Sequence, residues 1–177
     1  VLPVSVAALV FESNALVRCD NVITLSMTAN VDLPKGTNIT ITGLSGGRSA
    51  SGLTLSGPAI PFLGTQAEWV QQYNWAKFMV QNEFGVPANQ AVVVRFLLKN
   101  PDVAQSAVEP MLTISHPFGV RFGFSTVRGS ILGASDVPSI LGFYVSESSQ
   151  VQRSRNVLNF ILQSNVALYA GSNITIS

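Results

Sequence analysis

Apolar and polar residues alternate with a period of two along much of the chain. Every second residue from 23 to 33 is apolar, and the alternation resumes over residues 37–42, where Ile39 and Ile41 fall on the inward side. A period of two predicts half-buried β-strands, because successive side chains of a strand point to opposite faces. The inward residues predicted for the first run are Ile23, Leu25, Met27, Ala29, Val31 and Leu33.

Later segments also have strand character. Residues 91–98 are rich in Val, Phe and Leu, residues 111–115 form a short apolar run, and residues 118–127 alternate aromatic residues with Gly, Arg and Ser. Residues 66–84 fit both a helical stripe and a strand, and we expect a short helical turn followed by a strand from residue 75. Many short strands separated by turn residues predict an all-β protein, specifically a β-sandwich.

The first 42 residues recur at the end of the chain. Residues 1–42 align with residues 136–177 without a gap, at an offset of 135 residues. Chance gives few identities over such a span, so we interpret the segments as copies of one another. The identical pairs include Pro3 with Pro138, Val10 with Val145, Glu12 with Glu147, Ser13 with Ser148, Arg18 with Arg153, Asn21 with Asn156, Val22 with Val157, Asn30 with Asn165, Val31 with Val166, Leu33 with Leu168, Gly36 with Gly171, and the Asn-Ile-Thr-Ile runs at 38–41 and 173–176.

The repeat divides the chain into one β-sandwich unit, residues 1–135, and the opening strands of a second unit, residues 136–177. An apolar side chain left in water forgoes roughly 1.5–3 kcal/mol, so the apolar face of the partial unit should be covered. We expect either the rest of the parent chain or a neighbouring subunit to cover it. The residues predicted to form this face are Leu158, Phe160, Leu162, Val166 and Leu168.

A neighbouring subunit could complete the partial unit with its own N-terminal segment. Alternate residues of this segment are apolar and line one face, which makes it a candidate donor for β-strand addition between chains. Because donor and acceptor lie at opposite ends of the chain, such a contact would propagate into a filament unless it closed as a ring. The predicted donor residues are Leu2, Val4, Val6, Ala8 and Val10.

The composition of the chain indicates which partners and which cellular location to expect. Hydrophobic residues make up 47% and charged residues only 11%, with a formal net charge of +1. A charge so close to zero argues against nucleic acid or an anionic membrane as partner. The longest apolar stretches reach about ten residues, half of what a membrane-spanning helix needs. We therefore expect no membrane span, and a secreted or cell-surface protein whose surface is covered by sugar or by other subunits.

The strand and turn sequences resemble a known kind of module. NVITLSMTANVDLPKGTNITITGLSGG, at residues 21–47, and FLLKNPDVAQSAVEPMLTI, at residues 96–114, resemble a module repeated in very large cell-surface proteins of algae and other protists. The resemblance covers roughly residues 20–115 and restarts at residue 156. It implies immunoglobulin-like β-sandwich repeats with structural roles in coats or surface filaments, and it identifies a module better than an activity.

The residue types that usually carry catalysis are sparse. His116 is the only histidine and Cys19 the only cysteine, too few for a zinc site of ordinary ligand number. Gly43 to Gly47 matches the G-x-S-x-G pattern around Ser45, but the residues that follow are poor helix formers, so we interpret it as a loop. We expect no enzyme activity, no metal and no cofactor. Cys19 is interpreted as a small buried residue, with an intermolecular disulfide as the alternative.

Two further features suggest surface chemistry. Asn38 and Asn173 lie in Asn-Ile-Thr sequons at equivalent positions of the two copies, and the alternation points both outward, so we expect N-glycosylation there. Trp69, Tyr73 and Trp75 could form an aromatic ligand platform, although packing in the core is the commoner role of such residues.

The sequence thus favours a structural subunit of an extracellular filament or coat that assembles with copies of itself. The alternative is a carbohydrate- or ligand-binding sandwich of a cell-surface adhesin.

Overall fold

A computed structural model of the chain describes residues 5–50, 52–117, 121–137, 139–166, 168 and 170–175, with only the backbone given for residues 121–126 and 141. Its strands are β1 (Val6–Glu12), β2 (Asp20–Ala29), β3 (Asn38–Thr42), β4 (Leu53–Ser56), β5 (Gln66–Val70), β6 (Trp75–Met79), β7 (Val92–Lys99), β8 (Met111–Ser115), β9 (Arg121–Thr126), β10 (Ile140–Glu147) and β11 (Leu158–Ser164). The helical elements are α1 (Ile60–Leu63) and a 3₁₀ turn, η1 (Gln71–Tyr73). Within these described residues, no helix has the length and apolar character needed to cross a membrane.

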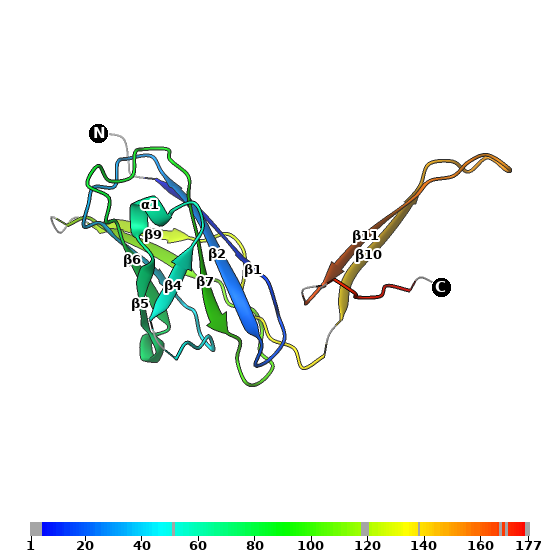
Figure 1. Cartoon of the computed structure of the whole chain (residues 1–177), viewed down its shortest axis with the longest axis horizontal. Coiled ribbons are helices and arrows are strands. Elements are labelled where there is room, and N and C mark those ends of the chain that lie inside the picture. Colours follow the sequence, from blue (N-terminus) through cyan, green and yellow to red (C-terminus); the bar gives the residue numbers. More distant parts are fainter. Residues whose placement is uncertain are drawn as a thin grey trace.

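The first nine strands form a β-sandwich. They are hydrogen-bonded in the order β1-β2-β7-β4-β5-β6-β3-β8-β9, which places β1, β2, β7 and β4 in one layer and β5, β6, β3, β8 and β9 in the other (Figure 1). The chain passes between the layers where β4 pairs with β5. The prediction of an all-β sandwich is confirmed.

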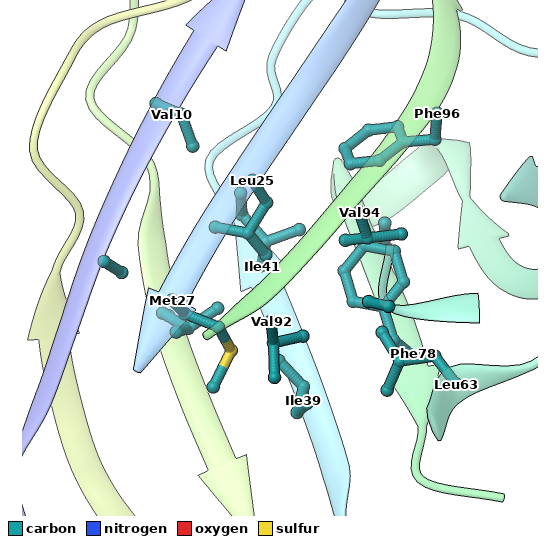
Figure 2. Packing of buried hydrophobic residues seen from close by; sticks show 14 of the residues in the cluster. Val10, Leu25, Met27, Ile39, Ile41, Leu63, Phe78, Val92, Val94 and Phe96 are labelled. Atoms are coloured by element: carbon teal, nitrogen blue, oxygen red, sulfur yellow. The ribbon is translucent and has the colours of Figure 1, made fainter. Parts of the chain in front are cut away.

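The inward residues of both layers meet in one core (Figure 2). Phe78 of β6 and Phe96 of β7 face each other across the layers with ring centroids 5.6 Å apart. The alternation predicted for β2 and β3 is observed, because Ile23, Leu25 and Ile41 are each at most 1% exposed. These side chains supply the apolar burial that holds the layers together.

The outer edge of β1 is covered by the segment that follows β9. Backbone N–H of Val10 donates to Arg128 O, and Arg128 N–H donates to Ala8 O, both at 2.9 Å. The next residue, Gly129, has a φ of +96°, and a Cβ there would lie 2.5 Å from Val10 O. Glycine therefore permits this close approach, and the edge of β1 is not free to pair with another chain along this stretch.

The N-terminal segment occupies a place that differs from the one predicted. Strand β1 pairs with β2 of its own unit, and Ala8 and Val10 are 7% and 2% exposed. The predicted donor residues Val6, Ala8 and Val10 thus belong to their own unit in this structure, and donating them to a neighbouring chain, which stays a prediction, would unpair β1 and expose core residues. Leu2 and Val4, the other predicted donor residues, lie outside the described residues.

Residues 66–79 also differ from expectation. Residues 66–70 form strand β5 rather than a helical turn, and the turn follows at η1 before β6 begins at Trp75. Asn74 closes this turn with a left-handed φ of 54°, a conformation that asparagine tolerates better than most residues. The segment is therefore a tight connection between two paired strands.

Strands β10 and β11 form a separate two-stranded hairpin. It projects away from the sandwich as a long ribbon (Figure 1). Its base touches the sandwich where Ala15 N–H donates to Asn165 O at 2.8 Å. The hairpin thus extends the molecule beyond the end of the first unit.

Candidate assembly surface

The projecting hairpin has the same strand pairing as the first hairpin of the sandwich. In the sandwich, Glu12 pairs with Ile23 and Val10 with Leu25. In the projecting hairpin, Glu147 pairs with Leu158 and Val145 with Phe160, each residue displaced by 135 positions. Towards its base, β10 contains an irregularity between Ile140 and Gly142. Across the rest of the ribbon, β10 and β11 reproduce the register of β1 and β2.

The turn between the two strands is also reproduced. Arg18 and its counterpart Arg153 both adopt left-handed backbone conformations, with φ of 59° and 63°. The N–H of Val22 donates to Ser13 Oγ at 2.8 Å, and the N–H of Val157 donates to Ser148 Oγ at the same distance. Non-glycine residues rarely have a positive φ, so this agreement is specific. The two hairpins are equivalent in conformation as well as in sequence.

Burial distinguishes the two hairpins. Ile23, Leu25 and Val10 are 0%, 1% and 2% exposed in the sandwich, whereas their counterparts Leu158, Phe160 and Val145 are 51%, 44% and 43% exposed. We call the apolar side of the projecting hairpin the hairpin face; it consists of Phe143, Val145, Leu158, Phe160 and Leu162. The face that is core in the first unit is thus open in the hairpin.

The hairpin face is partly ordered by its own contacts. The rings of Phe143 and Phe160 stack at a centroid separation of 6.1 Å and an interplanar angle of 27°. The C-terminal segment lies beside the ribbon (Figure 1), and Leu168 and Ile174 line a shallow groove there with Phe143 and Leu162. Leu168 and Ile174 are the counterparts of the buried Leu33 and Ile39, yet they are 49% and 55% exposed.

The five residues predicted for the apolar face of the partial unit do not all lie on one surface. Leu158, Phe160 and Leu162 share the hairpin face, because they alternate along β11. Val166 is half-buried beyond the end of β11, and Leu168 lies in the groove formed by the C-terminal segment. Sequence reasoning missed Phe143 and Val145, although their alternation along residues 143–147 was the available signal.

The two sequons lie in different surroundings. Asn38 begins β3 between β6 and β8, on the outer side of the sheet, and is half-buried. Asn173 is exposed in the C-terminal segment. The side of the strand predicted for Asn38 is observed, and glycosylation stays a prediction.

The three aromatic residues proposed as a platform do not share a face. Trp69 pairs with the inward residue Ala76 and packs against the core, whereas Trp75 lies on the outer side, with Lys77 Nζ 5.5 Å from its ring centroid. Tyr73 is 65% exposed on η1. A flat ligand-binding platform requires coplanar rings on one surface, and these elements do not provide one.

The other residues considered for chemistry are dispersed. Residues 43–47 form a turn, after which Arg48 pairs with Lys99 across an isolated β-bridge, so Ser45 does not lie on the strand-to-helix elbow of a hydrolase. Cys19 is half-buried and unpaired with another cysteine. His116 follows β8. No cluster of three potential metal ligands occurs among the residues described.

Comparison with known proteins yields only distant structural similarity. No protein-family model and no curated protein sequence matches the chain. A DUF4466 family protein from Parabacteroides merdae is similar over 81% of this chain and 48% of its own, with 8% identity and a TM-score of 0.47. BcpA, the major pilin subunit of Bacillus cereus, is similar over 93% of this chain and 56% of its own, with 8% identity and a TM-score of 0.47.

A GH20 exo-β-N-acetylglucosaminidase from Vibrio harveyi covers 80% of this chain with 20% of its own length, at 12% identity and a TM-score of 0.42. The chain thus spans about half the length of the first two of these structures and a fifth of the third. With TM-scores below 0.5, these similarities carry no argument about function. The assignment to the β-sandwich class stands on the strand order and the shared core of this chain.

Proposed function

We propose that the chain is a structural module of an extracellular filament or cell-surface coat, in which β-sandwich modules are joined head to tail. The projecting hairpin is the opening hairpin of the following module, and its exposed face is covered by the remaining strands of that module. One observation carries this proposal: residues that are core in the first hairpin are about half exposed in an equivalent second hairpin.

The equivalence of the hairpins also supports one kind of partner for the hairpin face. In the first unit, β2 pairs with β7, and its inward residues belong to one core that also includes residues of β3 and β8. A sandwich of the same kind that lacks its own opening hairpin presents a complementary surface. An identical folded copy presents no such vacancy, since β1 and β2 already fill it. The joining is therefore β-strand addition, with the hairpin as donor.

Composition and sequence resemblance support an extracellular structural role. The chain has few charged residues and a net charge near zero, properties that suit a surface covered by neighbouring modules or sugar. The resemblance of its strand and turn motifs to repeated cell-surface modules points the same way. Electron microscopy of material purified from the native source should show filaments or a coat, and dispersed particles would contradict the assembly.

A lengthened chain tests the completion of the hairpin directly. Residue 177 aligns with residue 42, so a second copy of residues 43–135 appended after residue 177 would supply the missing strands. We expect the backbone amides of β10 and β11 to exchange with solvent at least about a hundredfold more slowly in this lengthened chain, because cooperative burial protects amides. A matched control carries Phe96→Asp in the appended copy, which prevents its core from forming.

Two side chains of the hairpin face are larger than their counterparts in the first unit, so the test needs a second lengthened chain. Phe143 and Phe160 stand where the first unit has Ala8 and Leu25, and overpacking a core costs about 1–3 kcal/mol. The lengthened chain is therefore also prepared with Phe143→Ala and Phe160→Leu. If the hairpin amides gain no protection in either lengthened chain, the proposal is wrong.

A further inference from the structure

A buried polar cluster ties the first hairpin to the rest of its sandwich. Asn21 is fully buried, and its Oδ1 accepts hydrogen bonds from the N–H groups of Ser13 and Asn14 at 3.0 and 3.2 Å. Its Nδ2 donates to Glu12 Oε2 and to Asn100 Oδ1, both at 2.8 Å. A buried carboxamide is expected to have such partners, and these join three strand ends, those of β1, β2 and β7.

The cluster depends on two groups that lie outside the first hairpin. Asn100 follows β7 and is fully buried, and its Nδ2 donates to the carbonyl oxygens of Asn14 and Leu16 at 2.9 Å. The N–H of Leu132 donates to Glu12 Oε2 at 2.7 Å. One asparagine side chain and one backbone N–H of the sandwich thus complete the polar cluster at the end of its opening hairpin, beside backbone hydrogen bonds such as that from Arg18 N–H to Pro101 O.

The projecting hairpin carries the other half of this arrangement. Asn156 Oδ1 accepts from the N–H groups of Ser148 and Ser149 at 3.1 and 3.0 Å, and Asn156 Nδ2 donates to Glu147 Oε2 at 2.8 Å. Asn156 and Glu147 are both exposed. Within the described part of the chain, no residue holds the places of Asn100 and Leu132 beside them, since those residues come from beyond the repeated segment.

We propose that Glu147 and Asn156 form a recognition site for the following module, which completes it with an asparagine side chain and a backbone N–H. The asparagine follows the strand equivalent to β7, and the N–H comes from the loop equivalent to residues 131–132. This inference rests on the proposed function and specifies the partner: a β-sandwich module with asparagine at that strand end.

The polar site adds selectivity to the apolar face. An apolar surface of any kind could cover Leu158 and Phe160, but it would leave the Glu147 carboxylate and the Asn156 amide buried without partners. Each unsatisfied polar group costs about as much as a lost hydrogen bond or more. The site therefore disfavours apolar partners that lack the two groups, and it sets the register in which the correct module docks.

A double-mutant cycle in the lengthened chain tests this site. The cycle combines Asn156→Ala with the same substitution at the appended copy of Asn100, and amide exchange of β10 and β11 reports the stability of the second unit. Each single substitution should reduce the protection about tenfold or more, in proportion to a lost buried hydrogen bond. The double substitution should reduce protection by less than the product of the two single effects.

The first unit provides two control cycles. Asn21→Ala and Asn100→Ala, whose side chains are hydrogen-bonded to each other, should have effects on the first unit that are coupled in the same way. Asn156→Ala and Asn100→Ala of the first unit, which are not in contact, should have independent effects. If the hairpin amides are protected but the effects of Asn156 and the appended asparagine simply multiply, the recognition site is wrong and the proposed function stands. If the hairpin amides are never protected, the proposed function itself fails.

Discussion

The carboxyl group of Glu12 makes the stability of the first unit depend on pH. Burial raises the pKa of its carboxyl above the ordinary value, while the hydrogen bonds from Asn21 and from the Leu132 N–H oppose that rise. Because the folded state favours the protonated form, the contribution of Glu12 to stability is greatest below the ordinary glutamate pKa. It is lost as the pH rises through the raised pKa of the folded state.

Glu12→Gln should remove this dependence on pH. The glutamine keeps a side-chain oxygen able to accept from Asn21 and Leu132, but it carries no charge. We expect the free energy of unfolding of the variant, relative to the unmodified chain, to increase between about pH 4 and pH 7. Urea denaturation across this range measures it, with Glu147→Gln on the exposed hairpin as the control. A constant difference between variant and unmodified chain would contradict the assignment.

Glycosylation is a second prediction at the residue scale. Asn38 lies on the outer side of β3 and Asn173 is exposed in the C-terminal segment, so neither asparagine side chain is enclosed in the core. Intact-mass measurement of material from the native source should show a loss of mass after enzymatic removal of N-linked glycans. Thr40→Ala and Thr175→Ala should each abolish one glycan. An unmodified native mass would refute the prediction for both sites.

At the scale of single elements, alternation revealed the strands but not their partners. The pattern of residues 23–33 correctly placed Ile23 and Leu25 inward, and residues 111–115 were predicted with the bounds of β8. The helix α1 escaped prediction because four residues are too few to display a helical period. Ala8 and Val10 of the N-terminal segment were correctly placed on one apolar side, but the strand with which the segment pairs depends on contacts far along the chain.

Contacts between residues that are remote in sequence also decide which candidate site residues lie together. Trp69 and Trp75 were grouped because they are close in sequence, yet η1 reverses the chain between two paired strands and sends the rings to opposite sides. The exposed face of the second copy was predicted correctly in part, because the repeat itself indicated which residues correspond to core residues. The Glu12 and Asn21 cluster was not predicted, since Asn100 and Leu132 are remote in sequence.

The two equivalent hairpins allow a matched comparison of core and exposed positions. Leu25→Ala should destabilise the first unit by about 2–5 kcal/mol, because it leaves a cavity in a packed core. Phe160→Ala, at the counterpart position, should change the unfolding free energy of that unit by less than about 0.5 kcal/mol. Chemical denaturation followed by tryptophan fluorescence reports on the first unit, which contains both tryptophans. A large effect of Phe160→Ala would show that the hairpin face packs against that unit.

At the scale of the whole molecule, the first unit holds together without the hairpin face. Its core includes residues of β1 to β8 and the adjoining loops, and the edge of β1 is covered by residues 127–129. Among the described residues, the hairpin contacts the sandwich near its base, where the Ala15 N–H donates to Asn165 O. The stability of the sandwich and the exposure of the hairpin are therefore separable properties.

Deleting residues 136–177 should separate these properties experimentally. We expect the shortened chain to remain folded, with an unfolding free energy within about 1 kcal/mol of that of the full chain, since the core of the sandwich contains no residue of the hairpin face and a lost backbone hydrogen bond such as that from Ala15 to Asn165 costs about 1 kcal/mol. It should also lose affinity for a dye that binds exposed apolar surface and any tendency to self-associate, because the hairpin face is gone.

Replacing Phe143 and Phe160 together by serine in the full chain should reproduce the loss of dye binding while leaving the sandwich intact. Unfolding of the shortened chain would place the boundary of the first unit beyond residue 135, and undiminished dye binding would show that the hairpin face is not the surface to which the dye binds.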